Sequence, residues 1–177
     1  NIMQKEALEN LDRLRRTGED KALVIAATGT GKTYMSAFDV IQFNPKKLLF
    51  LVHREDILRS AEQTYRSLCK NKNVTMGLYT GNVKELESDY IFATVQTIER
   101  NLENFKNDEF EYIVIDEAHH STSPTYEKIL EYFNPKFLLG MTATPERCDT
   151  GNIFDVFDNN IALEVRLNEA LENELIV

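Results

Sequence analysis

The sequence predicts an α/β fold, with a mostly parallel β-sheet covered by helices on both faces. Short continuous apolar runs, typical of strands buried on both faces, alternate along the chain with segments of helical periodicity. The polar clusters fall directly after apolar runs, where the carboxyl ends of parallel strands collect ligands. At 177 residues the chain is long enough for one such domain, which would bury roughly 70% of its unfolded surface.

The elements can be assigned in order along the chain. A helix is predicted over 4–16, where apolar residues recur at helical spacing until Thr17-Gly18 ends it. A strand ending near Ala27, a glycine-rich turn and a helix to Phe43 follow, and Asn44-Pro45 breaks that helix. The further predicted strands are 47–52, 74–79, 90–93, 112–115 and 137–141, and the further predicted helices are 54–70, 95–105 and 123–133.

The chain from Arg147 onward is less regular. It contains a short apolar segment over 153–157, a predicted strand over 161–165 and a predicted helix from about Leu167. We therefore expect one domain over 1–146 and an extension over 147–177.

Composition and charge are those of an ordinary globular domain, with 42% hydrophobic and 28% charged residues. No apolar run approaches the ~20 residues that span a bilayer, and no signal-peptide pattern opens the chain, so no membrane association is expected. Two cysteines, Cys69 and Cys148, lack metal-ligand spacing and indicate a reducing, cytoplasmic location. Because the chain does not begin with Met, we also expect flanking domains in a longer protein.

The net charge of −9 argues weakly against a purely electrostatic nucleic-acid binder. The charge is uneven, however. Residues 1–72 carry 13 Lys and Arg against 9 Asp and Glu, whereas the remainder carries 7 against 20. A local basic groove therefore stays compatible with the acidic total.

A phosphate-binding loop is predicted over 26–33, directly after the apolar run 22–25. Gly29 and Gly31 let the backbone wrap closely around phosphates, and the loop's N–H groups with the positive end of the next helix face the negative charge. Lys32 would reach the β- and γ-phosphates of ATP, and the Thr33 hydroxyl would bind Mg²⁺. The strict pattern has Gly where this chain has Ala26, so a chance match in an ordinary loop remains the alternative.

A second candidate cluster, Asp116-Glu117-Ala118-His119, directly follows the apolar strand 112–115. An Asp at this point can hold Mg²⁺ opposite the phosphate loop, directly or through water. The adjacent Glu117 can orient and deprotonate the attacking water. An acidic pair at a strand end is often only solvated loop, but the phosphate loop about 80 residues upstream favours the catalytic interpretation.

Over nearly its whole length the chain resembles the first RecA-like motor domain of superfamily 2 helicases and translocases, of the DEAH type. Sequences like 140–147 are typical of the bacterial branch related to restriction-enzyme and repair motors. The resemblance is carried by six short segments in the family's order: the loop at 27–33 as motif I, 51–54 as motif Ia, Thr80-Gly81 as the glycine motif, 93–97 as motif Ib, 116–119 as motif II and 142–144 as motif III.

The resemblance implies roles for further residues. Gln4, 28 residues before Lys32, is similar to the upstream glutamine that reads adenine, with a surface Gln opening a helix as the alternative. His119 would link motif II to motif III, although it could also be a packing histidine. Thr142 and Thr144 would relay nucleotide state toward nucleic acid, or simply end a strand with hydroxyls bonded to backbone.

The family's nucleic-acid contacts map onto five positions near strand ends and helix starts. Hydroxyls, backbone N–H groups and helix N-termini contact phosphates without reading sequence, which suits a motor that tracks any sequence. Helix capping is an equally good interpretation at these positions, and no basic–aromatic stripe accompanies them. His53 and His120 are expected to be surface or cap residues. The five candidates are Arg54, Thr80, Gly81, Thr94 and Gln96.

The sequence thus predicts the ATP-binding motor domain of an ATP-dependent DNA or RNA helicase or translocase, with DNA favoured. The family implies a second RecA-like domain in the same chain, which supplies an arginine finger worth ~10³–10⁵ in rate, so residues 1–177 alone should hydrolyse ATP very slowly. A nuclease or restriction partner is also expected. Two alternatives remain: a double-stranded-DNA translocase that does not separate strands, and a degenerate nucleotide-binding scaffold. Intact Lys32, Thr33, Asp116 and Glu117 argue against the scaffold.

Overall fold

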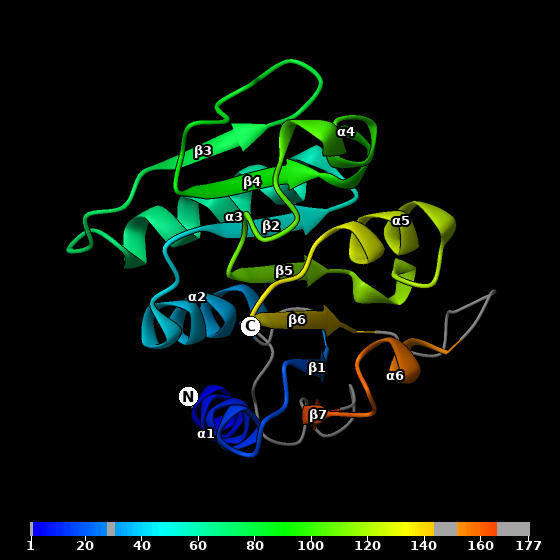
Figure 1. The fold of residues 1–177 in the computed structure, drawn as a ribbon. Helices are drawn as coiled ribbons and strands as arrows, with labels where there is room; N and C mark the ends of the chain where they lie inside the picture. The colour runs from blue at the N-terminus through cyan, green and yellow to red at the C-terminus, as the bar shows by residue number, and fades with distance from the viewer. Residues whose placement is uncertain (1, 28–30, 144–151, 166–177) are drawn as a thin grey trace.

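The computed structural model describes residues 2–27, 31–143 and 152–165. Within these ranges seven strands form one sheet in the order β3-β4-β2-β5-β6-β1-β7, and every neighbouring pair is parallel (Figure 1). The strands are β1 (Lys21–Ala26), β2 (Leu48–Val52), β3 (Met76–Tyr79), β4 (Tyr90–Thr94), β5 (Tyr112–Asp116), β6 (Phe137–Thr142) and β7 (Ile161–Val165).

Helices cover both faces of the sheet, as the sequence predicts (Figure 1). They are α1 (Ile2–Arg16), α2 (Lys32–Phe43), α3 (Glu55–Leu68), α4 (Val95–Arg100), α5 (Pro124–Tyr132) and α6 (Ile153–Val156), with short 3₁₀ turns η1 (Leu102–Asn104) and η2 (Ala118–His120).

The core consists of two apolar layers, because successive strand side chains point to opposite faces. Val24, Phe50 and Val114 pack beneath α1, α2 and α3 on one face. Their strand neighbours, such as Leu49 and Ile113, pack beneath α4, α5 and α6 on the other. Each fully buried side chain of this size contributes about 1.5–3 kcal/mol. Burial on both faces explains why the strands are continuous apolar runs.

A polar network is buried in the layer of α1, α2 and α3. The Arg15 guanidinium donates to both carboxylate oxygens of Asp39, at 2.8 and 2.7 Å, and the Tyr112 hydroxyl donates to the same carboxylate at 2.5 Å. The guanidinium also lies over the rings of Phe137 and Phe43, with its central carbon 4.7 and 5.4 Å from the ring centroids. The network ties α1 and α2 to β5.

One predicted helix is shorter than expected. Residues 95–105 do not form one helix: α4 ends at Arg100, and η1 follows. The Asn101 side chain donates to the Thr97 carbonyl at 2.7 Å, and its backbone N–H bonds to Ile98. An Asn that bonds locally in this way competes with continuation of the helix.

The predicted strand over 161–165 is confirmed as β7, which pairs with β1 at the edge of the same sheet. The described part of the predicted extension thus completes the sheet, while the boundary at 146 and 147 stays a prediction. The helix predicted from Leu167 lies outside the described residues. No helix in the part of the chain that the structure describes is long and apolar enough to cross a membrane.

Candidate functional site

A cleft opens at the carboxyl edge of the sheet, where α2 begins and β5 and β6 end. It encloses about 1280 Å³, including the part open to solvent, which is room for a nucleoside triphosphate. The fold brings six predicted site residues together in its lining. These are Gly31, Lys32, Thr33, Asp116, Glu117 and His119.

Gly31 closes the predicted phosphate loop and precedes α2. Its φ of +85° lies in the left-handed region that favours glycine, and a Cβ there would approach the Gln4 amide nitrogen to 2.5 Å. That amide nitrogen donates to the Gly31 carbonyl at 3.2 Å. Gln4 therefore lies against the end of the loop, as expected for a residue beside the nucleotide. Thr28, Gly29 and Thr30 lie outside the described residues.

The first turn of α2 is anchored to the core by a hydroxyl chain. The Ser36 hydroxyl donates to the Thr33 carbonyl at 2.7 Å and lies 2.8 Å from the Tyr65 hydroxyl of α3. Because the Ser36 proton is committed to Thr33, the buried Tyr65 must donate to Ser36. This chain fixes the helix end that carries Lys32 and Thr33.

The partly buried Lys32 and the buried Asp116 carry opposite charges on the lining of the cleft. Burial lowers the pKa of the Lys32 ammonium, and the nearby charges of Asp116 and Glu117 partly restore it. Burial likewise raises the pKa of Asp116, against the attraction of Lys32 and the Glu117 N–H, which donates to its carboxylate at 2.9 Å. Perturbed charges in a cleft are typical of functional sites. The arrangement can receive an anion at Lys32 and a cation at Asp116.

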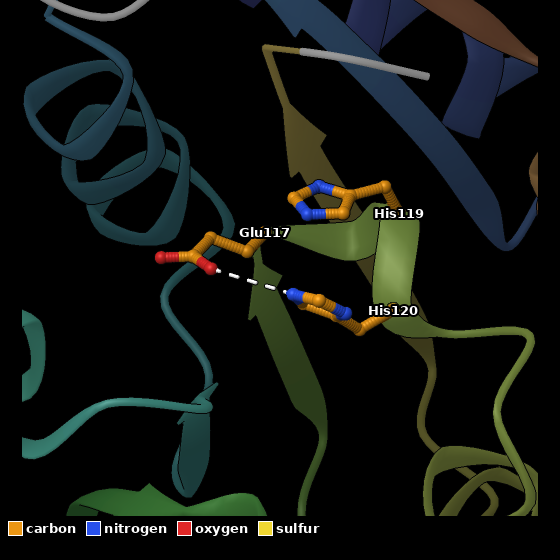
Figure 2. A group of neighbouring side chains, drawn as sticks. All are labelled: Glu117, His119 and His120. Carbon is orange, nitrogen blue, oxygen red and sulfur yellow. Dashed lines mark ion pairs between the residues drawn. The ribbon is translucent and has the colours of Figure 1, made fainter. Parts of the chain in front are cut away.

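Glu117 and two histidines form the group that follows β5 (Figure 2). Glu117 has a φ of +55°, a strained conformation for a residue other than glycine, and it directly precedes η2. Its carboxylate lies 3.6 Å from the His120 ring. One ligand atom from each of Glu117, His119 and His120 lies within 4.8 Å of the others.

His119 contacts the end of the neighbouring strand β6. Its Nδ1 lies 3.0 Å from the Thr142 hydroxyl, which is fully buried. The structure therefore brings together two of the three residues that the resemblance assigns to coupling. Thr144, the third, lies outside the described residues.

Two of the predicted nucleic-acid residues lie in a turn after β3. Thr80 is buried, and its hydroxyl accepts hydrogen bonds from the N–H groups of Asn82 and Val83, both at 3.2 Å. This is the geometry of a hydroxyl that stabilises a turn. Gly81 has no neighbour within 4 Å of an added Cβ. Thr80 therefore has a structural role whether or not the turn contacts nucleic acid.

Arg54 and Thr94 both have side-chain partners within the chain. The Arg54 guanidinium pairs with Asp56 at 2.7 Å on an exposed surface. The Thr94 hydroxyl lies 2.7 Å from that of Thr97 in the first turn of α4. These residues precede α3 and α4, but neither side chain makes a cap hydrogen bond, so the capping alternative is not supported at these two positions. Neither side-chain contact prevents binding of a phosphate.

Gln96 lines a second cavity beside the first cleft. Its contact with His53 was not predicted from the sequence. Its amide nitrogen is 3.1 Å from His53 Nδ1. The His53 ring stacks on His120, with centroids 5.3 Å apart and an interplanar angle of 29°. His53 directly follows β2, and His120 lies four residues after β5; the two strands are neighbours in the sheet. Their positions just after two strands are the sequence signal that could have indicated this contact.

Comparison with known proteins identifies the family. The family model described as "Type III restriction enzyme, res subunit" matches residues 1–147. The chain belongs to this family. The sequence-based assignment to superfamily 2 motor domains is thereby confirmed, while the DEAH subtype stays a prediction.

Two named relatives are similar to most of this chain. The chain is 31% identical over 172 residues to the Saccharomyces cerevisiae protein named "Putative ATP-dependent helicase IRC3", covering 88% of this chain and 25% of that protein. It is 29% identical over 184 residues to the Type I restriction enzyme EcoAI endonuclease subunit of Escherichia coli, covering 96% of this chain and 22% of that protein. The chain thus spans about a quarter of the length of these relatives.

The fold is also that of solved superfamily 2 motors. The structure of S. cerevisiae Dbp5 bound to RNA and ADP BeF3 superposes with a TM-score of 0.75 at 15% sequence identity, covering 96% of this chain and 47% of that chain. At this level of identity the likeness concerns the fold. It confirms the predicted α/β architecture of a RecA-like domain.

Proposed function

We propose that this chain is the ATP-binding first motor domain of an ATP-dependent helicase or translocase that acts on nucleic acid, with DNA favoured over RNA. The observation that carries the proposal is a single cleft holding Lys32 opposite Asp116 and Glu117 at the carboxyl edge of a parallel sheet. A cation for phosphates then faces carboxylates for a metal ion and a water. The helicase and restriction-enzyme names of the relatives support both the reaction class and the preference for DNA.

In this proposal the loop at 28–31 and Lys32 bind the triphosphate. Thr33 and Asp116 would hold Mg²⁺, since a hydroxyl and a carboxylate are oxygen ligands of the kind this ion takes, and both line the cleft. When bound, the ion supplies positive charge that neutralises phosphate oxygens. The partly buried Lys32 supplies further positive charge, and its lowered pKa indicates a site in which an anionic ligand is favoured.

Glu117 would orient the attacking water and accept its proton. Gln4 would read the adenine through its amide; its position against Gly31, in a shallow depression also lined by Met3 and Met35, supports this role. The contact between His119 and Thr142 supports a relay from the acidic pair to β6.

We further propose that a second RecA-like domain in the same protein completes the ATP site, and that a nuclease or restriction partner accompanies it. An arginine finger from such a domain is worth ~10³–10⁵ in rate. Residues 1–177 alone should then bind ATP weakly and hydrolyse it very slowly. The low cysteine content supports a cytoplasmic location.

The deciding experiment is Glu117→Gln in the full-length protein. We expect kcat for ATP hydrolysis to fall by about 10²–10⁴, the range for loss of a general base, while ATP still binds. Glu131→Gln, at an exposed position of α5, is the matched control and should leave kcat unchanged. An unchanged kcat in Glu117→Gln would refute the assignment of Glu117 as the base.

A second candidate function, translocation on double-stranded DNA without strand separation, is favoured by the relationship to the EcoAI subunit over 96% of this chain. Strand-displacement and triplex-displacement assays on the full-length protein separate the two. A helicase releases a strand from a forked duplex. A translocase displaces only the third strand of a triplex.

A further inference from the structure

His120 lies between the nucleotide cleft and a second cavity. Its imidazole contacts Glu117, which lines the nucleotide cleft, and it also lines the second cavity beside that cleft. We call this second cavity the histidine groove. It is lined by His53, Val95, Gln96, His120, Ser123, Thr125 and Tyr126.

Side-chain contacts connect the catalytic candidate Glu117 to the far side of the groove. The Glu117 carboxylate lies 3.6 Å from His120 Nε2, the contact drawn in Figure 2. The His120 ring stacks on His53, and His53 lies 3.1 Å from the Gln96 amide. The path therefore runs from the end of β5, past the end of β2, to the first turn of α4 beyond β4.

The groove has the chemistry of a phosphate site. Ser123 precedes α5 and makes no side-chain cap, while Thr125 and Tyr126 lie in the helix's first turn, where N–H groups have no intrahelical acceptor. Among the described residues that line it, none is acidic. Hydroxyls, an amide, imidazoles and a helix N-terminus together favour an anion over a cation.

A buried hydroxyl without a hydrogen-bond partner is independent evidence that the histidine groove binds a polar ligand or changes conformation. The Tyr126 side chain lines the groove and is only 1% exposed, yet its hydroxyl has no hydrogen-bond partner among the described residues. Burial raises the pKa of Tyr126, and the negative charges of Glu117 and Asp116 raise it further. A buried polar group without a partner is costly.

We propose that His120 is a positioning residue that restrains Glu117 until a nucleic-acid phosphate occupies the histidine groove. This rests on the proposed ATPase function of the cleft. A phosphate at the α5 N-terminus competes with Glu117 for His120, which frees the carboxylate to turn toward the attacking water. Nucleic acid then stimulates hydrolysis because it binds more tightly to the state in which Glu117 is released.

The test compares ATP hydrolysis by the full-length protein without nucleic acid and with saturating single-stranded or duplex DNA oligonucleotide. We expect His120→Ala to raise the basal rate about 1.5- to 5-fold, the value of one partly exposed electrostatic contact, and to bring the stimulation ratio close to one. His120→Gln retains a donor for Glu117 and should restore part of the ratio. Glu131→Ala, on the exposed side of α5, should change neither rate.

His53→Ala interrupts the path on the groove side. It should lower the stimulated rate, because the groove loses the imidazole on which His120 stacks. DNA affinity, measured by fluorescence anisotropy, establishes saturation for every variant. If His120→Ala does not fold by circular dichroism, His120→Gln and His53→Ala carry the test.

Three outcomes are decisive. A raised basal rate with a lost stimulation ratio in the His120 variants supports the restraint. An unchanged ratio, or equal loss of both rates, overturns it and leaves His120 as a structural residue. Wild-type protein that does not hydrolyse ATP would overturn the proposed function as well, so the two failures are distinguishable.

Discussion

Asp39 and Asp116 are both buried carboxylates in one domain, but their surroundings differ. Asp39 is fully buried and accepts three hydrogen bonds, two from Arg15 and one from Tyr112. Asp116 is 8% exposed and accepts one, from the backbone N–H of Glu117. Among the described residues no cation lies within ion-pair distance of Asp116, although Lys32 faces it across the cleft.

This difference in surroundings distinguishes a buried charge that stabilises the fold from one that is available to bind a ligand. A buried charge is tolerated when fixed partners compensate its lost hydration, and the Asp39 network supplies these partners from α1 and β5. Lys32 and Asp116 lack such compensation, and burial shifts the pKa of each toward its neutral form. Charges left in this condition at the edge of a cleft are the ones expected to receive a charged ligand.

The strongest test of this contrast between Asp39 and Asp116 is the Asp39→Asn variant. The amide cannot accept both guanidinium bonds and leaves Arg15 a largely buried cation, so the free energy of unfolding should fall by about 3–5 kcal/mol. Urea denaturation followed by circular dichroism measures this loss. Asp56→Asn, which removes the exposed pair with Arg54, is the matched control and should leave the transition unchanged. Equal curves for the two variants would mean that the buried network is not structural.

Asp116→Asn should have a large effect on ATP hydrolysis and a small effect on stability. ATP hydrolysis should fall by about 10²–10³, as for loss of one preorganised electrostatic group, while the free energy of unfolding falls by less than about 1 kcal/mol or increases. The stability barely depends on this carboxylate because burial already opposes its charge. Steady-state kinetics and urea denaturation of the same preparation provide both values. Destabilisation as large as that of Asp39→Asn would contradict the distinction drawn between the two acids.

The sequence predicts most of the fold because strands and helices are indicated by patterns of neighbouring residues. Continuous apolar runs at 22–25, 48–52 and 112–115 are buried on both faces, and their alternation with helices implies parallel strands. The acidic pair and the phosphate loop could be placed at the same sheet edge by the same rule. The strand order could not be derived this way, since nothing in the chain order states that β2 and β5 are neighbours.

Contacts across the sheet explain what sequence reasoning missed. His53 and His120 are 67 residues apart, and they meet only because their strands lie side by side. Asp39 could be taken for a solvated helix residue, although it falls on the same helical face as Met35 and Ser36, which is the buried one. That signal identifies a buried acid but not its partner Arg15, which comes from a different helix.

The smallest expected effect is on the pH dependence of stability, through the buried tyrosines Tyr65 and Tyr112. Burial raises the pKa of Tyr65 and of Tyr112 well above 10, the value expected in the unfolded chain; for Tyr112 the negative charge of Asp39 adds to the shift. The folded protein therefore keeps these protons above pH 10, whereas the unfolded chain loses them. Stability that is fully present below pH 10 should decline above it, by about 1.4 kcal/mol per pH unit for each tyrosine.

Tyr65→Phe isolates one of these contributions. The slope of unfolding free energy against pH, measured by urea denaturation between pH 9 and the alkaline limit of the assay, should become shallower by about 1.4 kcal/mol per pH unit. Because Tyr65 donates through Ser36 to the first turn of α2, its variant should also weaken ATP binding, whereas Tyr112→Phe should not. A slope that is the same in Tyr65→Phe and the wild type would show that this tyrosine ionises in the folded protein, and the anchoring of the phosphate loop through Ser36 would lose its support.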